Sequence, residues 1–507
     1  MTFQQILQGA EILSQSGDPA VTGVAYDSRQ VKPGYVFLAM RGESSDGNRF
    51  IDRAIAAGAV AVVTDSAAEQ PRNGIAWAQV PHGRRALGRL SANFYKRPAE
   101  RLSITGITGT NGKSTTTFLL ESILTAAKRK SVLVGTIEYH VAGNTLPAPH
   151  TTPESLELNK LLAEGLGHGA TEAVMEVSSH ALSQQRVFAV PFDVAVFSNL
   201  TRDHLDYHGT MEEYFDAKRI LFEGCGTDAA RAAVINRDDE YGVKLAAISK
   251  KAGSRVFTYG LTEGDFHASN VEITSRGTRL DIATPKERIA LFSPLMGRVN
   301  VYNILAAAGA AFARGVPTEA IADGVAKLAR VPGRFERVDC GQPFTVVVDY
   351  AHTDDALRNL TALAREFVMR AGQKGRVITV FGCGGDRDRA KRPLMGEAAG
   401  KGSDFVVLTS DNPRSEDPLA IMNDAIVGLQ RSGTKYVMEP DRRLAIALAL
   451  GEARPGDIVL IAGKGHEKVQ VSREGSLPFD DVDVARNVLA RAGYECQAAS
   501  AGAGLPA

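Results

Sequence analysis

The chain has 507 residues, of which 44% are hydrophobic and 23% are charged, as in an ordinary folded globular protein. At about 150 residues per domain, this length predicts three domains rather than a single core. The 58 basic and 58 acidic residues cancel. This balance gives no reason to expect nucleic acid or an anionic membrane as partner, so small molecules are favoured.

The cysteines and the N-terminus both favour a cytoplasmic protein. Cys225, Cys340, Cys383 and Cys496 stand far apart and form no CxxC pair, so neither a zinc site nor a disulfide framework is expected. The first residues lack the basic region and apolar stretch of a signal peptide. No apolar run approaches the roughly 20 residues that span a bilayer, so no membrane insertion is expected.

The first block, residues 1–88, predicts a small α/β domain. Short apolar strands alternate with an alanine-rich helix, which is typical of an α/β layer. The strands are expected at 34–40 and 60–63, and the helix at 51–57. An amphipathic helix at 86–95 leads out of the block and ends before Pro98.

The second block, residues 89–331, predicts a parallel sheet of the type found in phosphate-binding ATPases. Its strands recur at the spacing of crossover connections, which favours parallel pairing. Between about 256 and 292 the pattern changes to short alternating strands, which indicate a small antiparallel addition. The expected strands are 102–105, 131–134, 173–177 and 194–197, and the expected helices are 114–127 and 303–314.

The third block, residues 332–496, predicts a Rossmann-like α/β domain that begins at a hinge near 331–334. Helical segments separate four apolar strands, at 345–349, 377–381, 405–409 and 458–462. Residues 497–507 are small and weakly apolar, so a disordered tail is expected. The fold class is therefore α/β with three domains.

A phosphate-binding loop is the strongest local signal. A strand leads into a glycine-rich turn and a helix, so that backbone N–H groups and the helix dipole can close around phosphate oxygens. The match to G-x-x-x-x-G-K-[ST] is imperfect, because Ile107 replaces the first glycine between Gly106 and Gly109. A chance glycine-rich turn would not place strand, loop and helix in this order. The loop comprises Gly109, Thr110, Asn111, Gly112, Lys113, Ser114 and Thr115.

Metal-binding chemistry is expected near this loop. Lys113 would neutralise the outer phosphates of ATP, and the Ser114 hydroxyl would bind Mg²⁺. Glu176 ends a buried strand, where a nucleotide site needs a carboxylate, although a lone strand-end glutamate is usually just solvated. His204 lies in a stretch, 199–208, that is dense in metal-capable groups, but a structural histidine would also fit. By itself, Lys218 would be interpreted as a surface lysine.

Charged motifs follow all four strands expected in the third block. In an open α/β sheet, ligands bind outside the carboxyl ends of the strands. Acidic and basic groups that converge there suit a zwitterionic substrate. Single turns of this composition are common on protein surfaces, whereas four at one sheet edge indicate a site. The motifs are 349–352, 382–388 with Arg387 and the nearby Arg389, 410–414 and 463–467.

In this order, the motifs resemble those of the Mur ligases over nearly the whole chain. The resemblance implies an ATP-dependent ligase that extends a peptidoglycan precursor through an acyl phosphate. The motif Asp411-Asn412-Pro413-Arg414 implies that meso-diaminopimelate, rather than L-lysine, is added to UDP-MurNAc-L-Ala-D-Glu. Arg414 can hold the distal carboxylate that lysine lacks through a bidentate pair. Closure of the third domain on the second would bring amine and acyl phosphate together and exclude water.

The resemblance also implies residue roles. The 109–115 loop binds ATP with Asn303, Arg334 and Asp349; Lys113, Glu176, His204 and Lys218 are catalytic; and Ser114, Glu176, His204 and Lys218, carried as a carbamate, hold Mg²⁺. The UDP-linked dipeptide is bound by Tyr26, Ser28, Glu43, Ser44, Ser45, His150, Thr151, Thr152, Ser178, Gln184 and Arg186. Diaminopimelate is bound by Arg387, Asp411, Asn412, Pro413, Arg414, Gly463 and Glu467.

Two departures and three alternatives accompany this interpretation. His150 stands where related sequences often have Asn, and Asp354 replaces a common proline. A ligase that adds L-lysine is disfavoured by Arg414, and a folylpolyglutamate synthetase by the N-terminal block and by residues 411–414. An ATP-switched interaction protein or motor would leave the zwitterion site unexplained. The chain is expected to act as a monomer.

Overall fold

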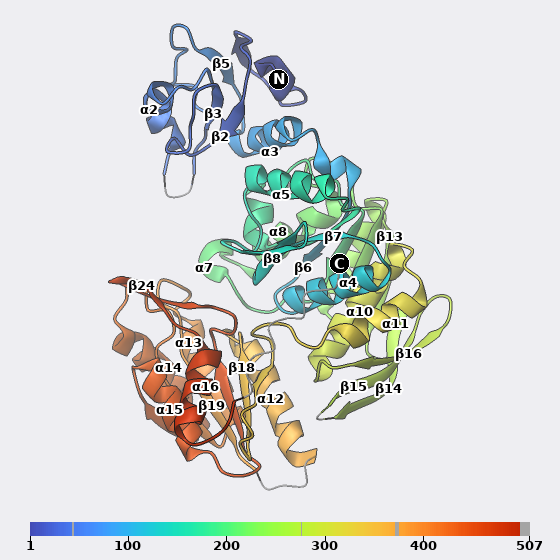
Figure 1. Cartoon of the computed structure of the whole chain (residues 1–507), viewed down its shortest axis with the longest axis vertical. Helices are drawn as coiled ribbons and strands as arrows, with labels where there is room; N and C mark the ends of the chain where they lie inside the picture. The colour runs from blue at the N-terminus through green and yellow to red at the C-terminus, as the bar shows by residue number, and fades with distance from the viewer. Residues whose placement is uncertain (43–44, 275, 371–374, 497–507) are drawn as a thin grey trace.

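The computed structural model describes residues 1–42, 45–274, 276–370 and 375–496, which form three α/β domains along the chain (Figure 1). The three-domain α/β class predicted from the sequence is confirmed. Glu43, Ser44 and the expected tail 497–507 lie outside the described residues. The exact domain boundaries remain predictions.

The N-terminal domain contains a five-stranded sheet in the order β1-β5-β4-β3-β2, in which β1 is antiparallel and the other strands are parallel. The core of this domain packs against α3, which leads into the central domain. The elements are α1 (Phe3–Leu7), β1 (Ser14–Ser16), β2 (Gly23–Ala25), β3 (Tyr35–Ala39), η1 (Gly47–Phe50), α2 (Ile51–Ala56), β4 (Ala61–Thr64), β5 (Ala76–Gln79), α3 (Gly83–Phe94) and η2 (Pro98–Arg101).

The central domain contains an eleven-stranded sheet in the order β16-β15-β14-β13-β12-β11-β6-β10-β7-β8-β9. In this order, the neighbouring strands from β14 to β7 are parallel, and antiparallel strands extend both edges, β15 and β16 at one and β8 and β9 at the other. The strands are β6 (Ser103–Thr108), β7 (Ser131–Val134), β8 (Glu138–Val141), β9 (Asn144–Pro147), β10 (Glu172–Glu176), β11 (Val194–Phe197), β12 (Ala232–Asn236), β13 (Arg255–Gly260), β14 (Phe266–Thr274), β15 (Gly277–Ala283) and β16 (Arg288–Ser293).

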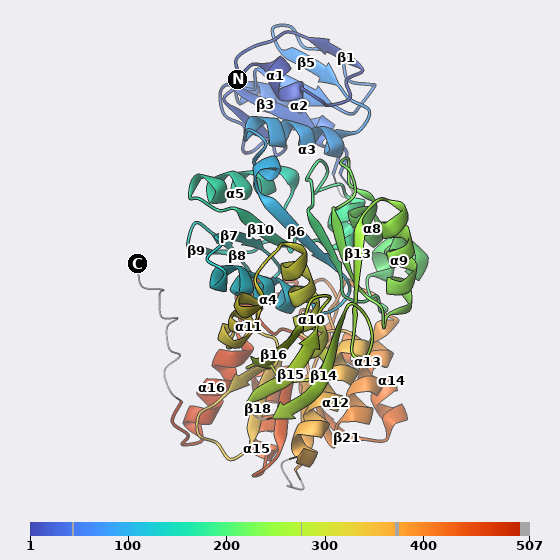
Figure 2. The same ribbon diagram turned by 90° about the vertical axis from the view of Figure 1, so that its right-hand side faces the viewer.

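Helices cover both faces of the central sheet, because both faces of its buried strands are apolar (Figure 2). One core includes α4, α10 and α11, and the other includes α5, α6 and α8. The helices are α4 (Lys113–Ala126), α5 (Ser155–Gly167), α6 (Ser179–Ser183), α7 (Leu205–His208), α8 (Met211–Glu223), α9 (Glu240–Lys251), α10 (Arg298–Ala313) and α11 (Thr318–Lys327).

The C-terminal domain contains a six-stranded sheet in the order β17-β18-β22-β19-β20-β21 and a separate hairpin, β23–β24. The four strands predicted to carry charged motifs, β18, β22, β19 and β20, are parallel neighbours. The elements are β17 (Glu336–Val338), β18 (Thr345–Asp349), α12 (Asp354–Arg370), β19 (Val377–Phe381), α13 (Lys391–Gly402), β20 (Phe405–Leu408), α14 (Pro418–Ser432), β21 (Lys435–Met438), α15 (Arg442–Glu452), β22 (Ile458–Ala462), β23 (Val469–Ser472), β24 (Gly475–Pro478) and α16 (Asp481–Arg491).

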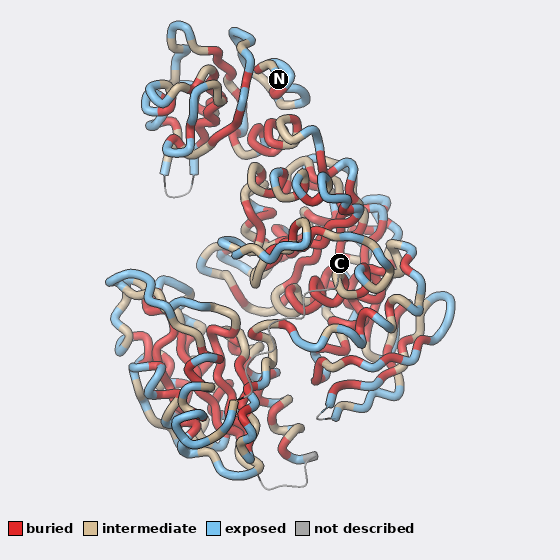
Figure 3. The backbone as a smooth tube through the Cα atoms, in the orientation of Figure 1, coloured by how far each residue is buried: buried red, intermediate tan, exposed pale blue. Residues whose placement is uncertain are grey.

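Most predicted elements lie where the sequence pattern placed them. The antiparallel addition is confirmed as β14–β16, but it begins at Phe266 rather than near 256, because β13 still pairs in parallel with β12 and β14. Figure 3 shows burial concentrated in the sheets and in the helix faces that cover them. Helix α10 begins at Arg298 rather than at 303. Gly297, directly before it, has a φ of +97°, which is not a helical angle, so the helix starts after this glycine. Within the described ranges, no helix is both long and apolar enough to cross a bilayer.

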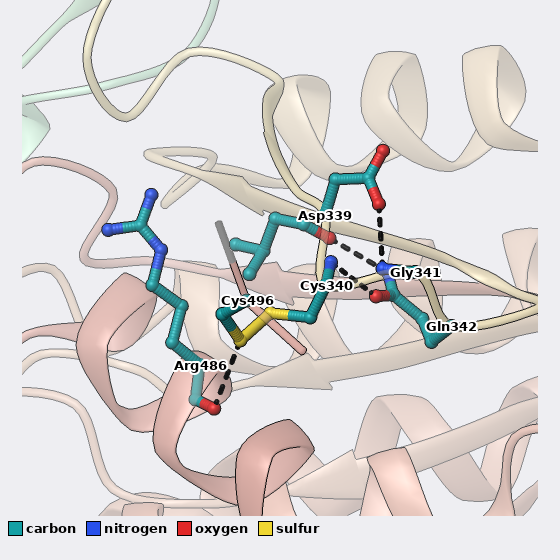
Figure 4. The surroundings of a disulfide bond; sticks show 7 residues. Asp339, Cys340, Gly341, Gln342, Arg486 and Cys496 are labelled. Carbon is teal, nitrogen blue, oxygen red and sulfur yellow. Dashed lines mark hydrogen bonds between the residues drawn. A yellow bond between two sulfur atoms is a disulfide. The ribbon is translucent and has the colours of Figure 1, made fainter. Parts of the chain in front are cut away.

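A disulfide links Cys340 to Cys496, which corrects the expectation that the cysteines stay unpaired (Figure 4). Cys340 follows β17 and Cys496 follows α16, so the bond ties the last described residue to the first strand of the C-terminal sheet. The pair could not be predicted, because 156 residues separate the two cysteines and only folding brings them together. Cys225 and Cys383 are free and buried.

Candidate active site

The phosphate-binding loop connects β6 to α4, and its backbone is held by the strand beside it. Thr110 N–H donates to the Asn199 carbonyl at 2.8 Å, and Asn111 N–H donates to the Asn199 side chain at 2.9 Å. Ser198 Oγ donates to the Asn111 carbonyl at 2.6 Å. These contacts fix the loop before any phosphate arrives. The Lys113 ammonium folds back onto the Gly109 and Thr110 carbonyls at 2.9 and 2.8 Å.

Two glycines are essential to the shape of this loop. Gly109 has φ +145°, and a Cβ there would lie 1.9 Å from Ser198 Oγ. Gly112 has φ +87°, and its Cβ would lie 2.4 Å from Asn303 Oδ1. Gly106 instead lies inside β6, where a Cβ would meet Phe192 at 2.7 Å. The displaced glycine of the motif therefore serves packing, and the loop itself begins at Gly109.

Glu176 lies at the end of β10 and is 1% exposed. Its carboxylate accepts hydrogen bonds from Thr136 N–H at 2.8 Å and from Thr136 Oγ1 at 2.9 Å. Thr136 Oγ1 also meets Thr151 Oγ1 at 3.0 Å, and Thr152 Oγ1 donates to the Glu176 carbonyl at 2.8 Å. Ser178 N–H donates to Thr152 Oγ1 at 3.1 Å. The structure thus brings the predicted metal carboxylate and three predicted dipeptide ligands together.

Lys218 is not a surface lysine, because it is 1% exposed. Its Nζ donates to the Gly109 carbonyl at 2.8 Å and lies 4.5 Å from the centre of the Tyr214 ring. Burial and the neighbouring Lys113 lower the pKa of Lys218 well below its usual value. Only a neutral amine reacts with CO₂, so this environment suits carbamate formation.

His204 lies beside the same tyrosine, with its ring centre 6.1 Å from that of Tyr214. It has φ +54°, which marks a strained position for a non-glycine residue. Burial lowers the pKa of His204, and the neighbouring Asp203 opposes that shift. Its backbone N–H donates to Asp203 Oδ1 at 2.9 Å, and its ring Nε2 lies 3.4 Å from Asp203 Oδ2. A neutral imidazole is the form that can bind a metal.

The predicted metal site can be compared with the donors present. In the described part of the chain, no three His, Cys, Asp or Glu side chains are grouped to hold a metal. The predicted set supplies one carboxylate from Glu176, one imidazole from His204 and the Ser114 hydroxyl. Mg²⁺ prefers oxygen ligands, so this set is thin until Lys218 becomes a carbamate. With that carboxylate added, the donor chemistry fits Mg²⁺.

The predicted nucleotide residues outside the loop also meet it. Asn303 on α10 lies against the loop, where its Oδ1 accepts from Thr116 Oγ1 at 3.5 Å. Arg334 donates to Ser114 Oγ at 3.2 Å, and its guanidinium lies 4.5 Å from the Tyr350 ring centre. Asp349 accepts from the N–H groups of Phe335 and Ala351 at 2.7 and 2.8 Å, which fixes the segment that carries Arg334.

Further contacts join the central and C-terminal domains around the loop. Asn111 Nδ2 donates to Asp355 Oδ2 at 3.0 Å. Lys391 Nζ lies 3.7 Å from Asp203 Oδ1, and Arg202 lies 3.4 Å from Asp388 Oδ2. The C-terminal domain is thereby held against the nucleotide loop. None of these three contacts was predicted, because each partner is an ordinary charged or amide residue in its own segment.

Gln184 and Arg186, which follow α6, form one edge of the predicted dipeptide site. Arg186 donates to Gln184 Oε1 at 2.7 Å and to the Thr152 carbonyl at 3.0 Å. Glu154, which the sequence did not single out, pairs with Arg186 at 3.1 Å and with Arg84 of α3 at 3.0 Å. It therefore links the dipeptide site to the N-terminal domain. The His150 carbonyl accepts from Tyr139, and burial lowers the pKa of the His150 side chain.

The predicted uridine-binding residues lie in the N-terminal domain. Tyr26 follows β2, and its hydroxyl donates to Glu157 Oε1 of α5 at 3.1 Å, so it already bridges two domains. Ser28, which lies close to Tyr26 in the sequence, is buried. Ser45 is exposed, and its carbonyl accepts from Gly42 N–H at 2.9 Å. Glu43 and Ser44 lie outside the described residues.

The predicted amino-acid site forms at the carboxyl edge of the C-terminal sheet. Asn412 Nδ2 donates to Glu467 Oε2 at 2.8 Å. Arg414 has φ +51° and donates to the Gly385 carbonyl at 2.7 Å. A Cβ at Gly384 would lie 3.1 Å from Arg414 Nη1 and 3.7 Å from Arg387 Cγ, so two arginines flank this glycine. The backbone of Pro413 packs against Gly385, and Gly463 N–H donates to the Asp349 carbonyl at 3.0 Å.

A separate open cleft of about 820 Å³ lies near the starts of β6 and β12 and does not include these residues. Among its acidic residues, Asp193 already pairs with Arg231 at 2.5 Å and with Arg314 at 3.4 Å, and it accepts from Ile104 N–H at 2.9 Å. We assign no chemistry to this cleft.

A phosphate-binding loop held against a charged sheet edge of a third α/β domain defines an ATP-dependent ligase. Domain comparisons agree: residues 20–95 match the "Mur ligase family, catalytic domain", 107–311 the "Mur ligase middle domain" and 333–465 the "Mur ligase, glutamate ligase domain". The chain belongs to the Mur ligase family.

Individual relatives cover almost the whole chain. The UDP-N-acetylmuramoyl-L-alanyl-D-glutamate–2,6-diaminopimelate ligase of Solibacter usitatus is 55% identical over 94% of each chain. The ligase of the same name from Geobacillus thermodenitrificans is 45% identical over 93% of this chain and 95% of its own. A solved structure of a ligase with this name has a TM-score of 0.68 at 35% identity, and covers 97% of this chain and 99% of its own.

More distant structures share the fold alone. MurF from Acinetobacter baumannii has a TM-score of 0.66 at 20% identity, and covers 97% of this chain and 98% of its own. A folylpolyglutamate synthase from Mycobacterium tuberculosis, complexed with ADP and AMPPCP, has a TM-score of 0.62 at 19% identity, and covers 82% of this chain and 96% of its own.

Proposed function

We propose that this ligase adds meso-2,6-diaminopimelate to the D-glutamate of UDP-MurNAc-L-Ala-D-Glu, with ATP as co-substrate. The observation that carries the proposal is the meeting of two sites across a domain interface. Arg334 and Asp355 of the C-terminal domain contact Ser114 and Asn111 of the nucleotide loop. An activated acid on one side can therefore meet an amine held at the sheet edge on the other. Both relatives at 45–55% identity carry the name of this reaction.

The chemistry explains why ATP is needed. A carboxylate is inert to amines at neutral pH, so the D-glutamate carboxylate first attacks the γ-phosphate of ATP to give an acyl phosphate and ADP. The amine of diaminopimelate then attacks the acyl carbon, and a tetrahedral intermediate expels phosphate. The backbone N–H groups of the loop and Lys113 would bind the phosphates and stabilise charge on the transferred group. The contacts between the two domains would exclude water from the acyl phosphate.

Several residues of the dipeptide site would orient the attacking acid. Thr151, Thr152 and Ser178 surround Glu176, and Arg186 lies beside Gln184. Glu176, His204, Ser114 and carbamylated Lys218 would hold Mg²⁺, which screens the phosphate charges when bound. Tyr26, Ser28 and the 43–45 segment would hold the uridine nucleotide. Arg387, 411–414, Gly463 and Glu467 would hold the acceptor.

Acceptor-dependent phosphate release tests the proposal. ATP hydrolysis is measured with UDP-MurNAc-L-Ala-D-Glu present, and with meso-diaminopimelate or L-lysine added as acceptor. We expect release that diaminopimelate alone stimulates. A preference for lysine would overturn the acceptor assignment but keep the ligase reaction. ATP hydrolysis that neither acceptor stimulates would favour an ATP-switched interaction protein.

The carbamate on Lys218 has its own test. Lys218→Ala removes the group that would become the carboxylate, so turnover should fall sharply. A small added carboxylic acid should partly restore it by occupying the vacated position. Mass spectrometry cannot serve here because carbamates are lost in acid. Near-wild-type activity of Lys218→Ala without any effect of added acid would contradict the carbamate role.

The substrates also set the expected location and assembly. ATP and UDP-linked precursors are made in the cytoplasm, so the proposed reaction belongs there. A monomer is proposed as the working unit. Sedimentation at assay concentrations checks the assembly state.

A further inference from the structure

Lys464 is one of the largest fully buried side chains of the C-terminal domain. It follows β22 inside the predicted acceptor motif and is 0% exposed. A buried ammonium is costly unless polar partners replace the water that it loses. The sequence-based assignment left this lysine without a role, although it flanked Lys464 with the predicted ligands Gly463 and Glu467.

All the side-chain partners of Lys464 are predicted acceptor ligands. Its Nζ lies 2.9 Å from Asn412 Oδ1, 3.1 Å from Glu467 Oε2 and 3.5 Å from Asp411 Oδ1. Asn412 Nδ2 in turn donates to the same Glu467 oxygen at 2.8 Å. One cation thus connects two loops that follow β20 and β22, two parallel strands of the same sheet that are separated by β19.

The strand β23 fastens the same loop from the other side. Val471 N–H donates to Asn412 Oδ1 at 2.9 Å, and Arg414 N–H donates to the Val471 carbonyl at 3.0 Å. Gln470 Nε2 donates to the Asp411 carbonyl at 2.8 Å. The Asn412 oxygen therefore has two donors, Lys464 and Val471, which set the direction of its amide.

We propose that Lys464 is a positioning residue that presets the acceptor site for an amino acid with a single distal ammonium and carboxylate. The inference rests on the proposed function and deepens it. Two carboxylates, Asp411 and Glu467, share the one ammonium of Lys464, which leaves one negative charge uncompensated. That charge matches the distal ammonium of diaminopimelate. Arg414, whose backbone β23 holds in place, matches the distal carboxylate.

The arrangement distinguishes positioning from packing. A lysine that only filled space would be replaceable by methionine, which has a similar length and no charge. Here methionine would leave the Asp411 and Glu467 carboxylates facing each other without a cation and remove a donor from Asn412. The loops would separate or admit water and ions, and the preset geometry would be lost. The predicted dipeptide ligands lie outside the C-terminal domain and most predicted ATP ligands lie in the central domain, so binding of these two substrates should change little.

The experiment compares Lys464→Met with the wild-type full-length enzyme in the phosphate-release assay. We expect the KM for diaminopimelate to rise about tenfold or more, while the KM values for ATP and UDP-MurNAc-L-Ala-D-Glu stay within about twofold. The preference for diaminopimelate over L-lysine should narrow, because L-lysine does not use the Asn412 and Arg414 geometry. Lys468→Met is the matched control. Lys468 is a nearby, 65% exposed lysine that pairs with Asp480, and its replacement should leave all three KM values unchanged.

A second variant keeps the test decisive if Lys464→Met does not fold. Gln470→Leu removes the donor to the Asp411 carbonyl from a partly exposed position, and should raise the KM for diaminopimelate a few-fold. An unchanged KM for diaminopimelate in a folded Lys464→Met enzyme overturns the inference, as does an unchanged KM in Gln470→Leu when only that variant folds. Failure of the proposed function is distinguishable, because wild-type enzyme would then show no stimulation by diaminopimelate at all.

Discussion

Two predicted sites are held rigid in different ways: the nucleotide loop, residues 109–115, and the acceptor edge, formed by residues 382–388, 410–414 and 463–467 at the carboxyl ends of the C-terminal sheet. The nucleotide loop is shaped by backbone: Gly109 and Gly112 take positive φ angles, and carbonyls of the loop bind Lys113. The acceptor edge is shaped by side chains, which are tied together by buried cations such as Lys464. Both sites lie at the carboxyl ends of parallel strands, so the sheet geometry alone does not account for the difference.

The ligands explain the contrast. Phosphate groups present many equivalent oxygens, which a ring of backbone N–H groups can bind without any particular side chain. An amino acid presents one ammonium and one carboxylate at fixed positions, which requires charged side chains at fixed angles. Holding such side chains in place takes partners beneath them. We therefore expect the loop to be sensitive to added atoms and the acceptor edge to lost charges.

Arg442 is the strongest test of the dependence on buried charge. It is 0% exposed, pairs with Asp481 at 2.7 Å, and donates to the carbonyls of Ser410 and Ala462, which lead into the two acceptor loops. Arg442→Met leaves Asp481 buried and unpaired, so we expect a loss of about 3–5 kcal/mol of stability in the C-terminal domain. Hydrogen exchange of β20 and β22 measures this domain separately.

An exposed ion pair is the control for this comparison. Lys401 pairs with Glu397 one helical turn away on α13, and it is 67% exposed. Its replacement by Ala should cost less than about 1 kcal/mol. Equal effects of Arg442→Met and Lys401→Ala would show that the buried pair does not support the acceptor edge.

Gly109→Ala tests the opposite dependence, on backbone shape. The added Cβ would lie 1.9 Å from Ser198 Oγ at a φ of +145°, so the loop must move. Because displacements of about 1 Å can cost about 100-fold in rate, we expect a loss of phosphate release of at least that order. The control is Gly143→Ala in the β8–β9 turn, where φ is also positive but the Cβ meets open space. A similar loss in both variants would point to backbone strain rather than to the close approach.

The same contrast explains what the sequence could predict. The loop was recognisable from residues 109–115, because backbone recognition requires glycines at fixed spacing. The charged motifs were predicted to share one sheet edge, and the strands that carry them, β18, β22, β19 and β20, do lie side by side in parallel, while the acceptor role of this edge stays a prediction. The residues beneath the ligands were missed: Thr136 and Glu154 are common types in unremarkable segments. Their roles depend on contacts with residues distant in the sequence, which no local pattern encodes.

Some elements were missed for a related reason. The hairpin β23–β24 is short, mostly exposed and polar, so its pattern resembles a loop, yet β23 pairs with the acceptor motif. The bond between Cys340 and Cys496 joins residues that only the folded C-terminal domain brings together. Domain contacts such as that of Asn111 with Asp355 were equally invisible.

Arg414→Lys tests selectivity within the acceptor edge. Lysine keeps the charge but cannot form a bidentate pair with the distal carboxylate of diaminopimelate. We expect the KM for diaminopimelate to rise about tenfold, with little change for L-lysine. Competition between the two acceptors in one reaction measures the ratio directly. An unchanged ratio would mean that another group, such as Arg387, reads that carboxylate.

The smallest expected effect lies within the central domain, where His140 on β8 pairs with Glu121 of α4 at 2.8 Å and with Glu138 at 2.9 Å. Although burial opposes protonation, these two carboxylates raise the pKa of His140 to about 10. The pKa is higher in the folded than in the unfolded chain, so protonation stabilises the fold. This contribution is complete below about pH 6.5 and is lost as the pH rises towards 10.

Because the cluster is partly exposed, we expect the loss between these pH values to be about 1 kcal/mol. Comparing the unfolding of wild-type and Glu121→Gln enzyme at pH 6.5 and at pH 10 isolates the contribution. The wild type should be the more stable at pH 6.5, and the difference should shrink at pH 10. A difference that grows with pH would have the wrong sign for a raised histidine pKa. It would mean that Glu121 stabilises the domain through some partner other than His140.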